Sequence, residues 1–166
     1  MIDIHSHIIS GIDDGSKNTE MTIKMLEMAE ESGTTDIVAT PHFMRGRFEV
    51  TYKEVIDEVE NLKKLTKENS ININIYSGQE VYYSRNILEY YNQGMIGTIN
   101  NTRYMLIEFP MLEFNIEEAI NTLYELQIRG IVPIIAHPER YKQFIKNPSQ
   151  INLLIKEGML FQVNAG

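Results

Sequence analysis

The chain has 166 residues, of which 43% are hydrophobic, and this is enough for one ordinary globular core and too few for two large ones. The absence of cysteine excludes disulfides, thiolate metal sites and catalysis by a cysteine nucleophile. A formal net charge of −8 argues against non-specific nucleic-acid binding, and no signal peptide or membrane-inserting run is recognisable, so we expect one cytoplasmic domain over residues 1–166.

Short runs rich in β-branched residues alternate along the chain with longer segments of helical period. The runs predict about six strands, near Ile2–His5, Thr35–Thr40, Ile71–Tyr76, Tyr104–Phe109, Ile131–Ala136 and Leu160–Val163. Between them lie amphipathic stretches such as residues 52–65, whose apolar positions recur at a spacing of three and four. This alternation is typical of successive β-α units around a parallel sheet, so the expected fold class is α/β.

Residues with metal-binding chemistry follow the predicted strands at their carboxyl ends. They are His5 and His7 at the first strand, His42 after the second, Glu80 after the third, Glu108 in the fourth and His137 after the fifth. This set contains all 4 histidines of the chain. Parallel strands bring their carboxyl ends together, and imidazole with carboxylate suits manganese, zinc or iron. One such residue alone is more often a cap or a core hydrogen-bonding group, but their joint placement favours a metal site.

Several segments together resemble a known family. They are DIHSHII, the DDG after it, ATPH, SGQEVYY, IEFP and IIAHPERY, and the closing QVNAG resembles a family strand as well. They resemble the PHP superfamily and, more narrowly, the CpsB/CapC-type protein-tyrosine phosphatases. The resemblance implies a distorted TIM-like β/α barrel with about two or three divalent ions, usually Mn²⁺, with Zn²⁺ or Fe as alternatives. It also implies a partner, a bacterial kinase carrying phosphotyrosine that controls capsule or exopolysaccharide synthesis.

The same resemblance assigns roles to individual residues. It implies that His5, His7 and Glu80 bind one ion, that Glu80, Glu108 and His137 bind a second, and that Asp14 and His42 bind a third. Arg140 would contact the substrate phosphate, a role that suits its planar fork of donors. Arg140 and Asp14 are therefore the expected catalytic residues.

Four further charged residues lie near these positions. Asp3 shares a face with His5 and is expected to orient an imidazole. Asp13 is interpreted as structural. Arg45 and Arg47 follow His42 and are interpreted as ordinary surface residues.

The mechanism implied is attack on phosphorus by a metal-activated hydroxide, with tyrosine phenolate as the leaving group. A phenol pKa of about 10 means that this leaving group needs little protonation, so an aryl phosphate fits well. Two alternatives stay open. One is a phosphoesterase for a small alkyl phosphate such as histidinol phosphate, and the other is a catalytically impaired remnant that still binds metal.

One feature departs from the family pattern. Family members are longer, and a downstream Asp-x-His pair completes the first and third metal sites. A closed β/α barrel typically needs about 200 residues or more, so we expect a PHP domain that lacks its C-terminal part. Its sheet would then have an open edge. Either a second copy covers this edge in a homo-oligomer, or the sequence is a fragment.

Overall fold

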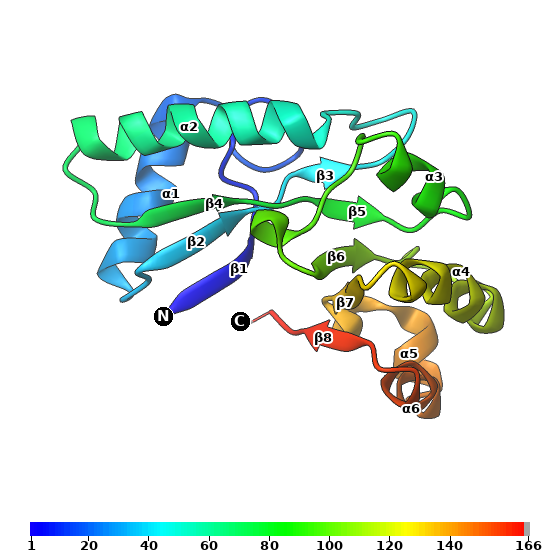
Figure 1. The fold of residues 1–166 in the computed structure, drawn as a ribbon. Helices are drawn as coiled ribbons and strands as arrows, with labels where there is room; N and C mark the ends of the chain where they lie inside the picture. Colours follow the sequence, from blue (N-terminus) through cyan, green and yellow to red (C-terminus); the bar gives the residue numbers. More distant parts are fainter. Residues whose placement is uncertain (165–166) are drawn as a thin grey trace.

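The computed structural model of the protein describes residues 1–164, which form an α/β fold (Figure 1). The elements in chain order are β1 (Ile2–Ser6), α1 (Thr19–Glu31), β2 (Asp36–Ala39), β3 (His42–Phe43), α2 (Tyr52–Glu68), β4 (Asn74–Ser77), β5 (Glu80–Tyr82), α3 (Ile87–Asn92), η1 (Ile99–Asn101), β6 (Tyr104–Glu108), α4 (Ile116–Ile128), β7 (Val132–Ala136), η2 (Pro138–Arg140), α5 (Lys142–Lys146), α6 (Ser149–Lys156) and β8 (Leu160–Gln162). None of the helices in this part of the chain has the length and apolar character needed to cross a membrane.

All strand pairs in the described residues are parallel. One sheet has the order β1-β2-β4 and the other has the order β3-β5-β6-β7-β8. The chain passes from the first sheet into the second at two places, between β2 and β3 and between β4 and β5. Backbone hydrogen bonds continue across this junction, from the Gly78 N–H to the Ala39 carbonyl at 2.9 Å and from the Glu80 N–H to the Pro41 carbonyl at 3.0 Å. The two sheets are therefore neighbouring parts of one strand layer.

A glycine permits the close approach at this junction. A Cβ atom on Gly78 would lie 2.8 Å from Val38 Cγ1 and 3.0 Å from Thr40 Cγ2, which is closer than packed carbon atoms tolerate. Any larger residue would force apart the two strands that change sheets here.

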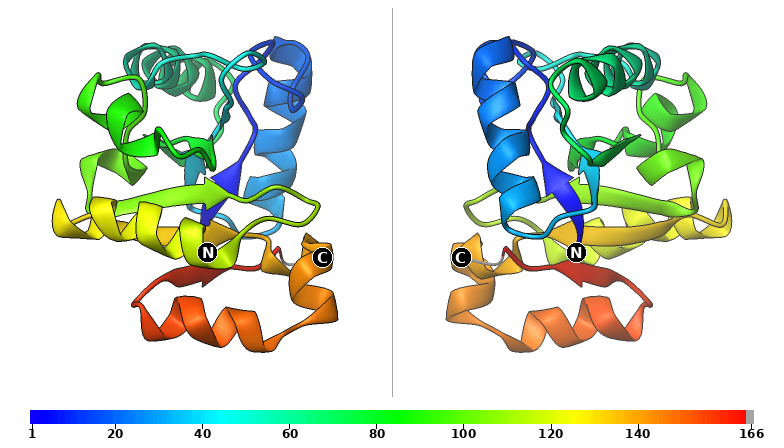
Figure 2. Two further views of the ribbon diagram at one scale, coloured as in Figure 1. Left: turned by 90° about the vertical axis from the view of Figure 1, so that its right-hand side faces the viewer. Right: turned by 90° about the vertical axis from the view of Figure 1, so that its left-hand side faces the viewer.

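Helices lie along the outside of the strand layer, as Figures 1 and 2 show. Helices α1 and α2 cover the first sheet through one apolar cluster, whose members include Leu26, Ile37, Val55, Val59 and Ile75. Helices α3 to α6 cover the second sheet through a larger cluster, whose members include Ile87, Ile107, Leu123, Phe144 and Leu154. The alternation along β6 places Met105 and Ile107 in this outer core and Leu106 in a small cluster with Ile134 and Ala136.

The six expected strands and the α/β class are confirmed, with small differences in bounds. The sequence pattern did not predict β3 and β5, because two and three residues are too short for a visible alternation. The described residues form two parallel sheets and no closed sheet, so a closed barrel is not observed. The outer strands β1 and β8 are nevertheless linked by a side-chain hydrogen bond between His5 Nδ1 and Gln162 Oε1 at 2.8 Å.

Helix α2 offers a test of local stability. Thr51 caps it with a capping box, in which the Thr51 side chain accepts from the Glu54 N–H and the Glu54 carboxylate accepts from the Thr51 N–H. We expect Thr51→Ala to lower the free energy of unfolding by about 1 kcal/mol, measured by urea denaturation. Thr19→Ala is the matched control, because Thr19 is exposed on α1 and Asn18 caps that helix. Equal losses in the two variants would contradict the capping role.

Candidate metal centre

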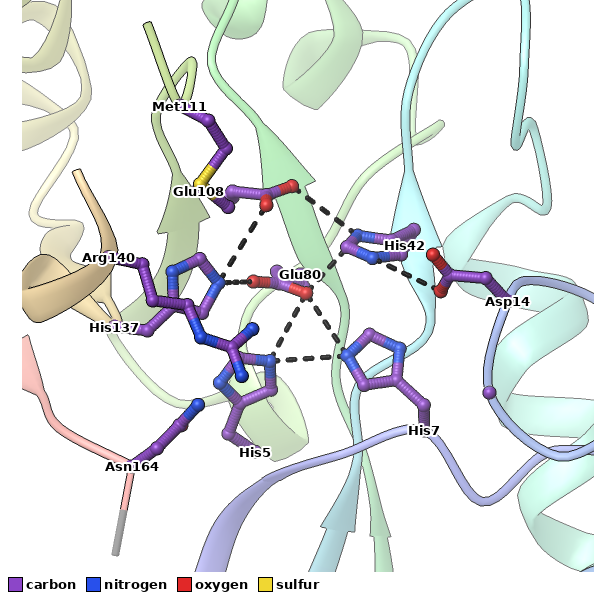
Figure 3. Close-up of a pocket in the computed structure, with 11 residues that line it drawn as sticks. His5, His7, Asp14, His42, Glu80, Glu108, Met111, His137, Arg140 and Asn164 are labelled. Carbon is purple, nitrogen blue, oxygen red and sulfur yellow. Dashed lines mark hydrogen bonds and ion pairs between the residues drawn. The ribbon is translucent and has the colours of Figure 1, made fainter. Parts of the chain in front are cut away.

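The six candidate metal ligands that the sequence places at the predicted strands converge at one end of the strand layer (Figure 3). His5 lies on β1 and His7 directly follows it. His42 and Glu80 begin β3 and β5, the short strands that continue β2 and β4 into the second sheet. The remaining two come from the next strands of that sheet, with Glu108 at the end of β6 and His137 directly after β7. The junction between the sheets thus brings ligands of the first sheet to those of the second.

The Glu80 carboxylate is the centre of this cluster. Its Oε2 atom lies 3.1 Å from each of three imidazole nitrogens, contributed by His5 Nε2, His7 Nε2 and His42 Nδ1. Its Oε1 atom lies 2.7 Å from His137 Nε2. All 4 histidines of the chain therefore contact one carboxylate that is only 1% exposed.

Two further carboxylates extend the cluster on either side. Glu108 lies 3.6 Å from His42 Nδ1 and 3.7 Å from His137 Nε2. Asp14 lies at the exposed rim, with its Oδ1 atom 3.4 Å from His42 Nε2. Three sets of donor atoms lie within 4.8 Å of one another, and they are His5 with His7 and Glu80, His7 with Asp14 and His42, and His42 with Glu80 and Glu108.

These sets bear on how ions could be shared among the ligands. The first set equals the ligands that the family resemblance gives to one ion, and the second contains the Asp14–His42 pair. His42 joins Glu80 and Glu108 in the third set, where the resemblance has His137. The assignment of each residue to an ion therefore stays a prediction.

Hydrogen bonds fix the orientation of two imidazoles. His7 Nδ1 lies 2.7 Å from Asp13 Oδ2, and His5 Nδ1 lies 2.8 Å from Gln162 Oε1. Each bond leaves the Nε2 atom of its ring facing Glu80. Metal-bound histidines usually have such a partner on the other nitrogen, because it sets the tautomer and the ring orientation.

The partner expected for His5 was wrong. The Asp3 carboxylate accepts from the backbone N–H of His5 at 3.0 Å and does not orient its imidazole, a role that Gln162 fills. Asp13, interpreted as structural, has two roles. Besides contacting His7 Nδ1, it accepts hydrogen bonds from the backbone N–H groups of Gly15 and His42, which connect the first loop to β3. The sequence signal for Gln162 was weak, because it is a single polar residue in a short strand.

Three buried atoms of the cluster indicate that it suits a cation. His42 Nδ1, Glu80 Oε2 and His137 Nδ1 have no hydrogen-bond partner of acceptable geometry among the described residues. Buried polar atoms normally have partners, and leaving them without one is costly. Of these, His42 Nδ1 and Glu80 Oε2 lie 3.1 Å apart, and a divalent ion would satisfy both; the donor set suits manganese, zinc or iron.

The pKa values of the cluster reflect burial together with this crowding. Burial raises the pKa of Glu80, but the hydrogen bond from His137 and the close imidazoles of His5 and His7 outweigh it and hold that pKa well below its usual range. Burial lowers the pKa of His7, yet bonds to Asp13 and Glu80 prevail and raise it to about 10. Burial and the neighbouring Glu80 raise the pKa of Glu108 to about 7. In the absence of metal, a proton on His7 thus compensates the negative charge of Glu80.

A cavity of about 410 Å³ opens above the cluster. It is lined by the metal-binding residues together with Gly15, Met111, Arg140 and Asn164. The exposed guanidinium of Arg140 points over His5 and His137 (Figure 3), and no carboxylate within residues 1–164 forms an ion pair with it. Arg45 instead pairs with Glu49 on the surface, and Arg47 lies over the ring of Phe48.

The stability of the metal-free chain should fall as the pH rises. In the folded chain the pKa of Glu108 is raised from 4.5 to about 7, and the pKa of His7 is raised from 6.5 to about 10. A pKa raised by folding stabilises the fold fully below the unfolded value and loses that contribution above the folded one. The free energy of unfolding should therefore decline first between 4.5 and about 7 and then further towards about 10. The lowered pKa of His42 opposes this decline below its usual value of 6.5, so the decline is steepest above that pH, and the lowered pKa values of Glu80 and Asp13 destabilise the chain only in acid.

Urea denaturation with a chelator over this pH range measures the effect. Glu108→Gln should flatten the lower part of the decline, since it removes one of the two groups. Added Mn²⁺ should reverse the slope, because the ligands must lose their protons to bind metal. Stability of the chelated chain that rises from about pH 5 to about pH 9 would count against these charge states.

Metal binding should depend on His137. Its backbone has a left-handed conformation, φ 30° and ψ 58°, which asparagine tolerates better than most residues. His137→Asn thus removes the imidazole with little added strain. We expect Mn²⁺ affinity to fall by more than about 100-fold in calorimetric titration, given that loss of a mere orienting partner costs 10–100-fold. Unchanged affinity, in a variant that unfolds normally with chelator present, would remove His137 from the ligand set.

Comparison with known proteins agrees with this geometry. The family described as "Capsular polysaccharide synthesis, CpsB/CapC" matches residues 1–166. CapC from Staphylococcus aureus is 40% identical over 166 residues, which are 99% of this chain and 64% of the relative. The tyrosine-protein phosphatase YwqE from Bacillus subtilis is 32% identical over 100% of this chain and 65% of its own length. The tyrosine-protein phosphatase CpsB from Streptococcus pneumoniae is 34% identical over 99% of this chain and 68% of its own length.

A solved structure gives the same result. It comes from work on YwqE from Bacillus subtilis and CpsB from Streptococcus pneumoniae, described as unique metal-dependent tyrosine phosphatases. It superposes with a TM-score of 0.93 at 32% identity and covers 98% of this chain and 66% of the solved one. The chain spans about two thirds of the length of the relatives it matches, 64% and 65% in the first two. With a family match along its whole length and a cluster of histidines and carboxylates that could hold metal ions where its two sheets meet, this chain belongs to the CpsB/CapC family.

Proposed function

We propose that this chain carries the metal-binding centre of a phosphoesterase that hydrolyses phosphotyrosine on a protein. One observation carries the proposal: buried donor atoms without hydrogen-bond partners lie beside an exposed arginine in the same cavity. The names of the relatives support the reaction, since two are tyrosine-protein phosphatases and the solved structure is described as metal-dependent.

The proposed cofactor is Mn²⁺, with Zn²⁺ or Fe as alternatives, because all three accept a mixed imidazole and carboxylate set. The residues that would hold the ions are His5, His7, Asp14, His42, Glu80, Glu108 and His137. When bound, such ions stabilise charge on phosphoryl oxygens and provide a water that is acidic enough to attack at neutral pH. Both oxygens of Glu80 face imidazoles, so this carboxylate could serve as a ligand of two such ions.

Arg140 is proposed to bind the non-bridging oxygens of the phosphate. Its position on η2 follows from Pro138, which fixes the backbone just after His137 and starts this turn. The planar guanidinium can donate two parallel hydrogen bonds to one phosphate, which a single ammonium group cannot do. Charge that develops on those oxygens during the reaction would be stabilised by the same donors.

Asp14 is proposed to act at the entrance of the site. Its carboxylate is 58% exposed and lies 3.4 Å from His42 Nε2, so it stays hydrated in the metal-free chain and would exchange that water for an ion. This exposure distinguishes it from Glu80 and Glu108, which are 1% and 7% exposed.

The proposed substrate is a phosphotyrosine-bearing bacterial kinase involved in capsule or exopolysaccharide synthesis. The family description supports the capsule connection, and the relatives' names support the phosphotyrosine. We further propose that the two sheets are parts of a PHP-type distorted barrel in a single domain. The hydrogen bond between His5 on β1 and Gln162 on β8 supports this, since it joins the outer strands of the two sheets.

Phosphate release from a phosphotyrosyl peptide tests the function. The purified chain is assayed with Mn²⁺ and then with chelator, and compared with Arg140→Ala and Arg45→Ala. We expect Mn²⁺-dependent release that Arg140→Ala lowers by about 10²–10³-fold in kcat/KM, as for other donors to a developing oxyanion. Arg45→Ala is the matched control, because it removes an exposed arginine outside the cavity. Release that persists with chelator, or that is absent from folded Mn²⁺-loaded chain, would overturn the proposal.

A further inference from the structure

A second cavity of about 360 Å³ adjoins the metal centre. It shares Asp14, His42, Glu108 and Met111 with the first cavity, so the two meet over the cluster. The metal-binding function does not explain this second space, because its remaining lining residues carry no metal-binding groups.

The walls of the second cavity are mainly apolar, and they come from two loops and one strand. The loop after β3 and the loop after β6 face each other, and the end of β5 contributes one tyrosine. The apolar and aromatic lining residues are Met44, Phe48, Tyr82, Pro110, Met111 and Leu112. The acidic and imidazole groups lie only at the end that is shared with the metal centre, and Arg47 is the one charged residue that lines the rest of the cavity.

The Phe48 ring is held in position before any ligand arrives. Met44 and Phe48 exchange two backbone hydrogen bonds, of 2.7 and 2.9 Å, which close a tight turn. The ring stacks on His42 at 5.6 Å between centroids with an angle of 12°, and the Arg47 guanidinium lies 4.8 Å from its centroid. A ring fixed in this way is a preorganised wall that costs little entropy when a ligand binds.

The opposite wall leaves apolar surface in contact with water. Leu112 is 66% exposed and Met111 is 38% exposed, although both face a cavity next to the metal centre. Covering such surface with an apolar group is favourable, and methionine next to an aromatic ring adapts well to a flat ligand.

We propose that this second cavity binds the aromatic ring of an aryl phosphate monoester whose phosphate lies between the metal centre and Arg140. This inference rests on the proposed function and assigns its preference for an aryl ester to Phe48, Met111 and Leu112. The space is sufficient, since a cavity of about 150 Å³ can hold benzene. The distribution of polarity fits as well, with the carboxylates and the imidazole at the phosphate end and mainly apolar groups at the ring end, where the one charged group, Arg47, lies over the Phe48 ring.

Selection by binding can be separated from selection by leaving group. Aryl esters react faster in any case, because phenolate leaves more easily than an alkoxide. Non-hydrolysable phosphonates remove this difference, so phenylphosphonate and methylphosphonate report on the ring site alone. Calorimetric titration of the Mn²⁺-loaded chain measures both affinities without turnover.

We expect phenylphosphonate to bind at least about 10-fold more tightly than methylphosphonate, a ratio that one well-placed apolar group already provides. Phe48→Ala and Leu112→Ala should each reduce this ratio by roughly 3-fold or more and leave methylphosphonate affinity unchanged. The matched control for Leu112→Ala is Ile128→Ala, because Ile128 is also 66% exposed but lies on α4 outside the cavity.

The outcomes separate this inference from the proposed function. Equal binding of the two phosphonates, or a ratio that survives both substitutions, overturns the ring site while the phosphatase reaction stands. A variant that weakens both phosphonates equally also counts against the ring site, since it acts on the phosphate end. If neither phosphonate binds and no phosphate is released from the peptide, the proposed function fails and the ring site fails with it.

Discussion

The candidate metal centre depends on the contact of the Glu80 carboxylate with four imidazoles. They come from β1, from the segment after it, from β3 and from the segment after β7. These groups originate in both sheets, so the cluster forms only when the sheets meet correctly. An anion that is 1% exposed would be very costly without partners, and the surrounding nitrogens compensate for the lost water. The positions of β3 and β5, and the absence of a side chain at Gly78, serve this arrangement.

This arrangement shifts the pKa values of several members of the cluster away from their usual range, and that property is typical of sites shaped for function. Glu108 is pushed towards its neutral form by burial and by Glu80, while His7 is drawn towards its charged form by hydrogen bonds to Asp13 and Glu80. Perturbed groups that lie together in a cleft indicate a functional site more reliably than a single shifted residue does. The apolar second cavity beside the cluster adds a feature that charge alone would not provide.

The sequence predicted the α/β class, the six longer strands and the residues that converge on Glu80, because strand alternation and histidine placement leave clear local patterns. It could not predict β3 and β5, which are defined by pairing across the junction and not by any periodicity of their own. It gave the wrong partner for His5, since sharing a strand face put Asp3 near it while the true partner, Gln162, lies 157 residues away. Long-range side-chain contacts of this kind depend on how the sheets curve, which no local pattern records.

The bond between His5 and Gln162 also has a consequence for folding. Closing a contact between residues 157 positions apart costs loop-closure entropy, and this favours its formation after more local contacts. Gln162 additionally accepts from the His137 backbone N–H, so two imidazoles acquire their final positions only when β8 docks. We therefore expect the proposed metal site to be among the last parts of the described chain to assemble, so that a bound ion would stabilise a nearly complete fold.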